Sequence, residues 1–171
     1  MNVFDFAMQM ETDGKAYYEK LARQTDQAGL KTIFTRLAED EQKHYEIFQA
    51  LRTSGKAPAM QESTALAEAQ NLFAELLKGS ASSPGSKDDL AAYRQAMKLE
   101  ADSFRYYEDA AAKEATAEVK GLLLKIAAEE HKHFNILENI YHFINAPNQY
   151  LAWGEFSNLG QFRQFGRQVD A

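Results

Sequence analysis

The segment LAEDEQKHYEIF, Leu37 to Phe48, decides the fold. It contains no glycine or proline, and its apolar residues recur at helical spacing. Steps of four and three residues trace one stripe along this predicted helix: Leu30, Phe34, Leu37, Glu41, His44, Phe48 and Leu51. All of these are apolar except Glu41 and His44. Such a stripe is typical of a helix that faces the core of a bundle, so a carboxylate and an imidazole are expected on its buried face.

The second half of the chain repeats this pattern. A shift of 89 residues places Glu41 on Glu130 and His44 on His133, so an E-x-x-H pair again interrupts an apolar stripe. The second stripe consists of Val119, Leu123, Ile126, Glu130, His133, Leu137, Ile140 and Ile144. The chain therefore contains an internal repeat.

A further helix precedes the E-x-x-H helix in each copy. Residues 7–19, AMQMETDGKAYYE, align with residues 96–108, AMKLEADSFRYYE, without a gap. Helical stepping places one glutamate of each segment on its inward face, followed seven residues later by a tyrosine on the same face. The glutamates are Glu11 and Glu100, and the tyrosines are Tyr18 and Tyr107.

These segments predict an all-α fold of two repeated helix pairs. The expected helices span residues 3–27, 29–54, 88–113 and 116–145. Short connections near Gly29 and Thr116 make each pair antiparallel. The segment between the halves is amphipathic from Ser63 to Lys78, which predicts a short crossover helix. Two helix pairs joined by one long crossover form the ferritin-like four-helix bundle.

The bundle is expected to form one domain, residues 1–145. Its repeat halves cover about residues 4–54 and 88–144, and the crossover covers residues 55–87. Residues 146–171 form a tail rich in aromatic residues, which we expect to pack on the bundle or on a partner subunit.

Composition argues against several classes of protein. The net charge of −6 is unlike that of proteins that bind nucleic acid or membrane surfaces. Without cysteine, the chain has no disulfide, thiolate metal site or iron–sulfur cluster. We see neither a secretory signal nor a stretch long and apolar enough to span a membrane, so we expect a cytoplasmic protein.

The inward glutamates need a positive charge beside them. No lysine or arginine lies on the four inward stripes, and an unpaired buried ion costs several kcal/mol. Two divalent cations would supply four positive charges, and carboxylates with imidazoles suit iron, manganese or zinc. One glutamate from each of two helices, with E-x-x-H from each of the other two, is the pattern of di-iron carboxylate bundles. The alternative is a salt-bridged or partly solvated core. The candidate ligands are Glu11, Glu41, His44, Glu100, Glu130 and His133.

The chain resembles a rubrerythrin-type member of the ferritin-like superfamily over roughly residues 4–144. The segments METDGKAYYE, AEDEQKH, LEADSFRYYE and AEEHKH carry the resemblance. It implies a di-iron site in which Glu41 and Glu130 bridge the two metals. Glu11 and Glu100 would be terminal ligands, and each metal would bind one histidine.

Two features depart from full-length members of that family. Those proteins carry a cysteine-ligated rubredoxin iron that relays electrons, and this chain has no cysteine. They also carry a glutamate one turn after the third-helix ligand, where this chain has Ser103. The resemblance therefore does not imply, for this chain, a ligand exchange that depends on that glutamate. Ser103 and its repeat partner Gly14 would leave open positions for peroxide or oxygen; the alternative is a close approach of two helices.

The tyrosines are the candidate catalytic residues. A buried phenol needs a hydrogen-bond partner, and we expect Tyr18 and Tyr107 each to donate to a ligand carboxylate, across the bundle as in the family that the chain resembles. The alternative is a structural tyrosine bonded to a backbone carbonyl.

Two more carboxylates, Asp40 and Glu129, directly precede the E-x-x-H glutamates. The second ring nitrogen of a ligating histidine usually donates to a carboxylate or carbonyl. Repeat symmetry predicts a crossed arrangement in which Glu129 holds His44 and Asp40 holds His133. The alternative is an ordinary solvated charge at each position.

Three functions remain open from the sequence. The favoured one is an oxidoreductase in which two iron ions reduce hydrogen peroxide or oxygen with electrons from an external donor protein, in defence against oxidative stress. The second is iron handling, where iron is oxidised, stored or transferred. The third is a bundle that keeps metal only for stability or partner binding. Manganese or zinc could replace iron, and we expect a homodimer.

Overall fold

The computed structural model describes residues 2–78 and 87–145, and the regular structure of these residues is entirely α-helical. The helices are α1 (Val3–Gln24), α2 (Ala28–Ser54), α3 (Ala65–Lys78), α4 (Lys87–Lys113) and α5 (Ala117–Asn145). The two predicted helix pairs and the crossover helix are therefore confirmed. The predicted tail, residues 146–171, lies outside the described residues.

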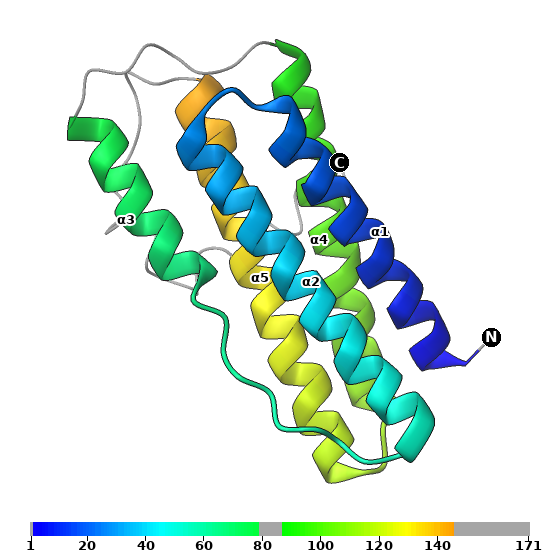
Figure 1. Cartoon of the computed structure of the whole chain (residues 1–171). Helices are drawn as coiled ribbons and strands as arrows, with labels where there is room; N and C mark the ends of the chain where they lie inside the picture. The colour runs from blue at the N-terminus through cyan, green and yellow to red at the C-terminus, as the bar shows by residue number, and fades with distance from the viewer. Residues whose placement is uncertain (1, 79–86, 146–171) are drawn as a thin grey trace.

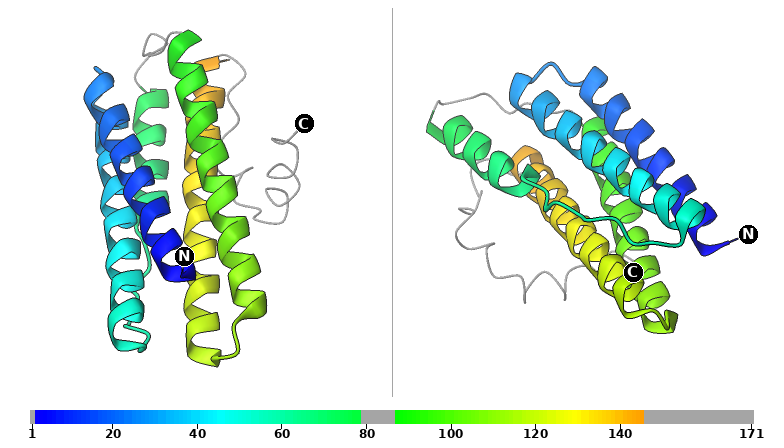
Figure 2. Two further views of the ribbon diagram at one scale, coloured as in Figure 1. Left: turned by 90° about the vertical axis from the view of Figure 1, so that its right-hand side faces the viewer. Right: turned by 60° about the horizontal axis from the view of Figure 1, so that its bottom comes forward.

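Four long helices form the bundle, and α3 lies along one side of it (Figure 1). Helices α1 and α2 pack together as one antiparallel pair, and α4 and α5 as the other. Contacts between α1 and α4 join the pairs, while α3 contacts both α2 and α5 (Figure 2). Within the described part of the chain, no helix is long and apolar enough to cross a membrane.

Local backbone geometry explains where the first two helices end. Helix α1 stops at Gln24, before the predicted residue 27, because Thr25 has an extended backbone with φ −88° and ψ 135°. The Thr25 hydroxyl accepts a hydrogen bond from the backbone N–H two residues later, at 3.2 Å, and holds this turn. Helix α2 stops before Gly55, whose φ of 67° is left-handed, a conformation that glycine adopts without steric cost.

Apolar side chains fill the interior on either side of the polar residues. The predicted stripe of α2 is buried along its whole length, and its Phe34, Leu37 and Phe48 are fully buried. The ring of Phe48 packs against that of Tyr107 on α4, with centroids 5.2 Å apart. These apolar layers hold the inward polar residues in the middle of the bundle, away from solvent.

Candidate metal centre

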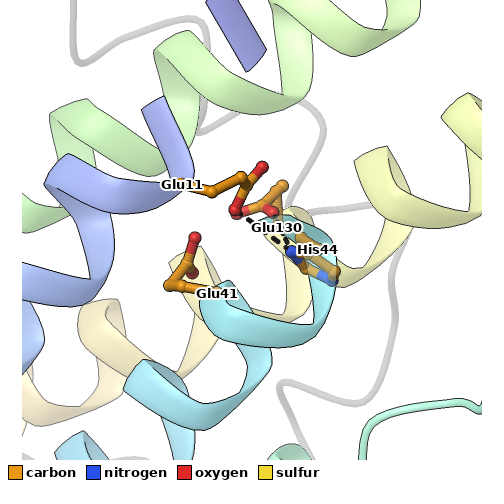
Figure 3. A group of neighbouring side chains, drawn as sticks. All are labelled: Glu11, Glu41, His44 and Glu130. Atoms are coloured by element: carbon orange, nitrogen blue, oxygen red, sulfur yellow. Dashed lines mark ion pairs between the residues drawn. The ribbon is translucent and has the colours of Figure 1, made fainter. Parts of the chain in front are cut away.

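Six polar side chains from the four long helices converge in the middle of the bundle, and none is more than 4% exposed. They fall into two groups, within each of which one possible ligand atom per residue lies within 4.8 Å of the others. One group is Glu11, Glu41, His44 and Glu130, drawn in Figure 3. The other is Glu41, Glu100, Glu130 and His133. Because both contain Glu41 and Glu130, these carboxylates lie between two neighbouring positions.

Each histidine turns its Nδ1 atom toward the central carboxylates. His44 Nδ1 lies 2.8 Å from Glu130 Oε1 and 3.4 Å from Glu11 Oε2, the two contacts dashed in Figure 3. In the other half, His133 Nδ1 lies 3.0 Å from Glu41 Oε1. The two imidazole rings stack at an interplanar angle of 23°. The site thus has the two-fold arrangement that the repeat predicts.

Many of the converging atoms have no hydrogen-bond partner, although they lie close together. These buried atoms include both histidine Nδ1 atoms, both oxygens of Glu130, and one oxygen each of Glu11, Glu41 and Glu100. A buried polar atom left unsatisfied costs about 1–3 kcal/mol, and a charged one costs more. Carboxylate oxygens and imidazole nitrogens are also the donor set that iron, manganese or zinc takes. The residues therefore fit a pair of metal ions.

The charges of these groups depend strongly on one another. Burial and the neighbouring charge of Glu130 raise the pKa of Glu41 and that of Glu100 well above their usual range. Burial alone would lower the pKa of each histidine, but the charges of Glu130 on His44 and of Glu100 on His133 outweigh it and raise both pKa values. The cluster on its own therefore retains protons, which a bound cation would displace.

The two buried tyrosines make crossed hydrogen bonds between α1 and α4. The Tyr18 hydroxyl donates to Glu100 Oε1, and the Tyr107 hydroxyl donates to Glu11 Oε1. Each tyrosine thus contacts the inward glutamate of the other repeat, as the sequence predicts. Both side chains are at most 2% exposed, so these hydrogen bonds are buried.

Asp40 and Glu129, which we call the outer carboxylates, contact the outer nitrogen of each histidine. His44 Nε2 lies 2.9 Å from Glu129 Oε2, and His133 Nε2 lies 3.3 Å from Asp40 Oδ2. This is the crossed arrangement expected from the repeat. Both carboxylates are buried. Burial alone would raise the pKa of Asp40, but hydrogen bonds from His133, Ser63 and Lys43 outweigh it and lower that pKa. A histidine that donates Nε2–H to a carboxylate leaves Nδ1 free to bind a metal.

The family model for Rubrerythrin matches residues 2–141. The chain belongs to the rubrerythrin family. No curated protein and no solved structure matches it. The family match covers nearly the whole bundle, including all six converging residues and both outer carboxylates. The fold is thus the ferritin-like bundle of this family, and its buried cluster of carboxylates and imidazoles could hold metal.

Ser63 is a residue of this rubrerythrin-family site that the sequence did not reveal. It lies on the crossover just before α3, and it contacts both outer carboxylates. The sequence marks it as a helix start, because serine is common there. Since the crossover lies outside the repeat, no symmetry indicates what Ser63 binds.

A cavity of about 220 Å³ adjoins the site between α1 and α4. Its lining includes buried Glu41 and Glu100 as well as exposed Asp13 and Asp102, so it connects the site with the surface. Gly14 and Ser103, the predicted small residues, are both in its lining. A Cβ atom at Gly14 would lie 3.1 Å from Glu41 Oε2, so the missing side chain makes room for that carboxylate.

Proposed function

We propose that this rubrerythrin-family chain is a di-iron oxidoreductase that reduces hydrogen peroxide or oxygen with electrons from an external donor protein. The observation that carries the proposal is the pair of overlapping groups that share Glu41 and Glu130. When bound, two iron ions at such a site would supply the two electrons that peroxide reduction needs.

The proposed ligands divide evenly between the two ions. Glu41 and Glu130 would bridge them, because each belongs to both groups. The remaining ligands would be Glu11 and His44 at one ion, and Glu100 and His133 at the other. The unpartnered oxygens and Nδ1 atoms of these residues support this assignment, because metal binding would satisfy them.

The cavity supports a small substrate. Its volume of about 220 Å³ suits hydrogen peroxide or oxygen, and its lining joins the surface to Glu41 and Glu100. Reduction of hydrogen peroxide to two water molecules takes up two electrons and two protons. Tyr18 lines the cavity and its hydroxyl donates to Glu100, so Tyr18 would hold or deliver a proton there. The proposal assigns the electrons to an external donor protein.

The test is anaerobic loading with Fe(II), followed by metal analysis and mixing with peroxide. We expect two iron atoms per chain, rapid oxidation by peroxide, and repeated turnover when a reductant is added. Ser103→Leu, which fills the cavity, should slow oxidation while two irons stay bound. Ser54→Leu makes the same change at an exposed position and should oxidise like the wild type. If two irons are bound but no turnover occurs, the proposed oxidoreductase activity is wrong.

One observation favours iron itself as the substrate. The exposed carboxylates of Asp13 and Asp102 line the cavity, and negative charge beside an entrance attracts cations. Under this second function, added Fe(II) would be oxidised and retained beyond two atoms per chain. A fixed stoichiometry of two through many turnovers would exclude storage.

A further inference from the structure

Ser63 contacts both outer carboxylates at once. Its backbone N–H donates to Glu129 Oε1 at 2.6 Å, and its hydroxyl donates to Asp40 Oδ2. The hydroxyl oxygen also accepts a hydrogen bond from the N–H of Ala65, the first residue of α3, at 3.1 Å. One residue of the crossover is therefore bonded to α2, α3 and α5.

Two hydrogen-bonded chains lead from this serine to the histidines. One runs from the Ser63 hydroxyl through Asp40 Oδ2 to His133 Nε2. The other runs from the Ser63 N–H through the two oxygens of Glu129 to His44 Nε2. Hydrogen bonds to a buried carboxylate are strong and directional, so they fix where its oxygens lie. The orientation of each imidazole thus depends on the position of Ser63.

The repeat alone cannot provide this contact. Asp40 and Glu129 occupy equivalent places in the two halves, whereas Ser63 belongs to the crossover and has no partner in the repeat. One residue outside the repeat therefore contacts both halves of a nearly two-fold site. The contacts also differ in kind, since Asp40 receives a side-chain hydroxyl and Glu129 receives a backbone N–H.

We propose that Ser63 is a positioning residue of the metal centre, which orients both histidines through Asp40 and Glu129 and couples the docking of α3 to metal binding. The proposal rests on the proposed metal site. Coupling of this kind is reciprocal: if docking of the crossover strengthens metal binding, metal binding strengthens docking by the same factor.

The two contacts predict an uneven effect of mutation. Ser63→Ala removes the hydroxyl bond to Asp40 and keeps the N–H bond to Glu129, so the site that contains His133 is affected most. Loss of such a partner typically lowers metal affinity about 10–100-fold. Ser63→Thr restores a hydroxyl and should recover most of the affinity. Asp40→Asn weakens the same chain at its middle residue and should reproduce the uneven loss.

The adjacent Thr64 provides a matched control. The exposed Thr64 donates its hydroxyl to Glu68 at 2.7 Å, so it belongs to the same turn but not to the site. Thr64→Ala also removes a hydrogen bond at the start of α3, yet it should bind metal like the wild type. Equal losses in the two variants would show that Ser63 only stabilises the helix start, and would overturn the proposal.

The experiment is a titration of the full chain with Co(II), followed by its visible spectrum, together with hydrogen exchange across α3. In the wild type we expect two Co(II) ions and slower exchange in α3 when they bind. In Ser63→Ala we expect weaker binding of one Co(II) ion and an altered visible spectrum. Metal binding should also slow hydrogen exchange in α3 less than it does in the wild type. If Ser63→Ala binds two ions like the wild type, the proposal fails. If the wild type itself binds none, the proposed metal site fails instead.

Discussion

The Tyr18 hydroxyl of α1 donates its hydrogen bond to Glu100 of α4 and not to Glu11 of its own helix. Tyr107 makes the equivalent bond back to Glu11. Direct contacts between α1 and α4 join the two helix pairs, and these two bonds cross the same boundary at the level of the site. The tyrosines therefore link the two repeats and the two candidate terminal ligands together.

Replacement of Tyr18 by phenylalanine should weaken metal retention without unfolding α1. The change leaves Glu100 Oε1 without its donor, and a hydrogen bond to a charged group contributes about 1.5–3 kcal/mol. We expect roughly a tenfold loss of metal affinity or more, measured by competition with a chelator. Tyr106→Phe is the control, because the Tyr106 hydroxyl donates to the Val3 backbone carbonyl at the surface and not to a candidate ligand. If Tyr18→Phe and Tyr107→Phe both match that control, the tyrosines are packing residues.

The inward residues could be predicted from sequence because two independent patterns agree on them. Helical periodicity placed Glu41 and His44 on a buried face, and the repeat placed Glu130 and His133 on another. The same repeat predicted the crossed contact between Glu129 and His44. Within the repeat, two aligned segments of the sequence give the same prediction for each position.

The remaining features lie where neither pattern applies. Ser63 is on the crossover, so its contacts arise from how the chain crosses the bundle and not from any period. Glu138 lies off the predicted stripe of α5, yet its side chain is buried. The early end of α1 is set by the extended backbone of Thr25, which propensity alone does not indicate.

Metal should stabilise the fold strongly. A ligand that binds only the native state raises the free energy of unfolding by about 2.7 kcal/mol at a concentration 100 times its Kd. Thermal unfolding with chelator should therefore occur at lower temperature than with Fe(II) or Mn(II), and the difference should grow with metal concentration. His133→Ala should lose most of this difference. Identical melting with and without metal in the wild type would contradict two-metal binding.

Gly14→Ala should weaken metal binding although it improves the helix. Alanine in a helix interior is about 0.5–1 kcal/mol better than glycine, but its Cβ would lie 3.1 Å from Glu41 Oε2 and displace that carboxylate. The matched control is Gly121→Ala, because a Cβ there meets no atom within 4 Å. The control should gain stability and keep wild-type metal affinity. Equal affinity in both variants would mean that Glu41 moves aside without consequence.

Glu138 should make the stability of the protein fall as pH rises. This side chain is only 6% exposed, its Oε2 atom has no hydrogen-bond partner, and burial raises its pKa from the usual 4.5 to about 7. Between these two pKa values the folded state holds a proton that the unfolded state has released. The free energy of unfolding therefore decreases as pH rises through this range, by on the order of 3 kcal/mol in total.

Glu138→Gln removes this titration while keeping the shape of the side chain. Relative to wild type, the variant should gain up to about 3 kcal/mol at pH 8 and little at pH 4, because the wild-type carboxyl is already neutral in the folded state at the lower pH. Urea unfolding in chelator at several pH values measures the difference with metal held constant. Glu46→Gln alters an exposed carboxylate and should show no such dependence on pH. A gain for Glu138→Gln that is the same at pH 4 and pH 8 would show that the pKa of Glu138 does not differ between the folded and unfolded protein.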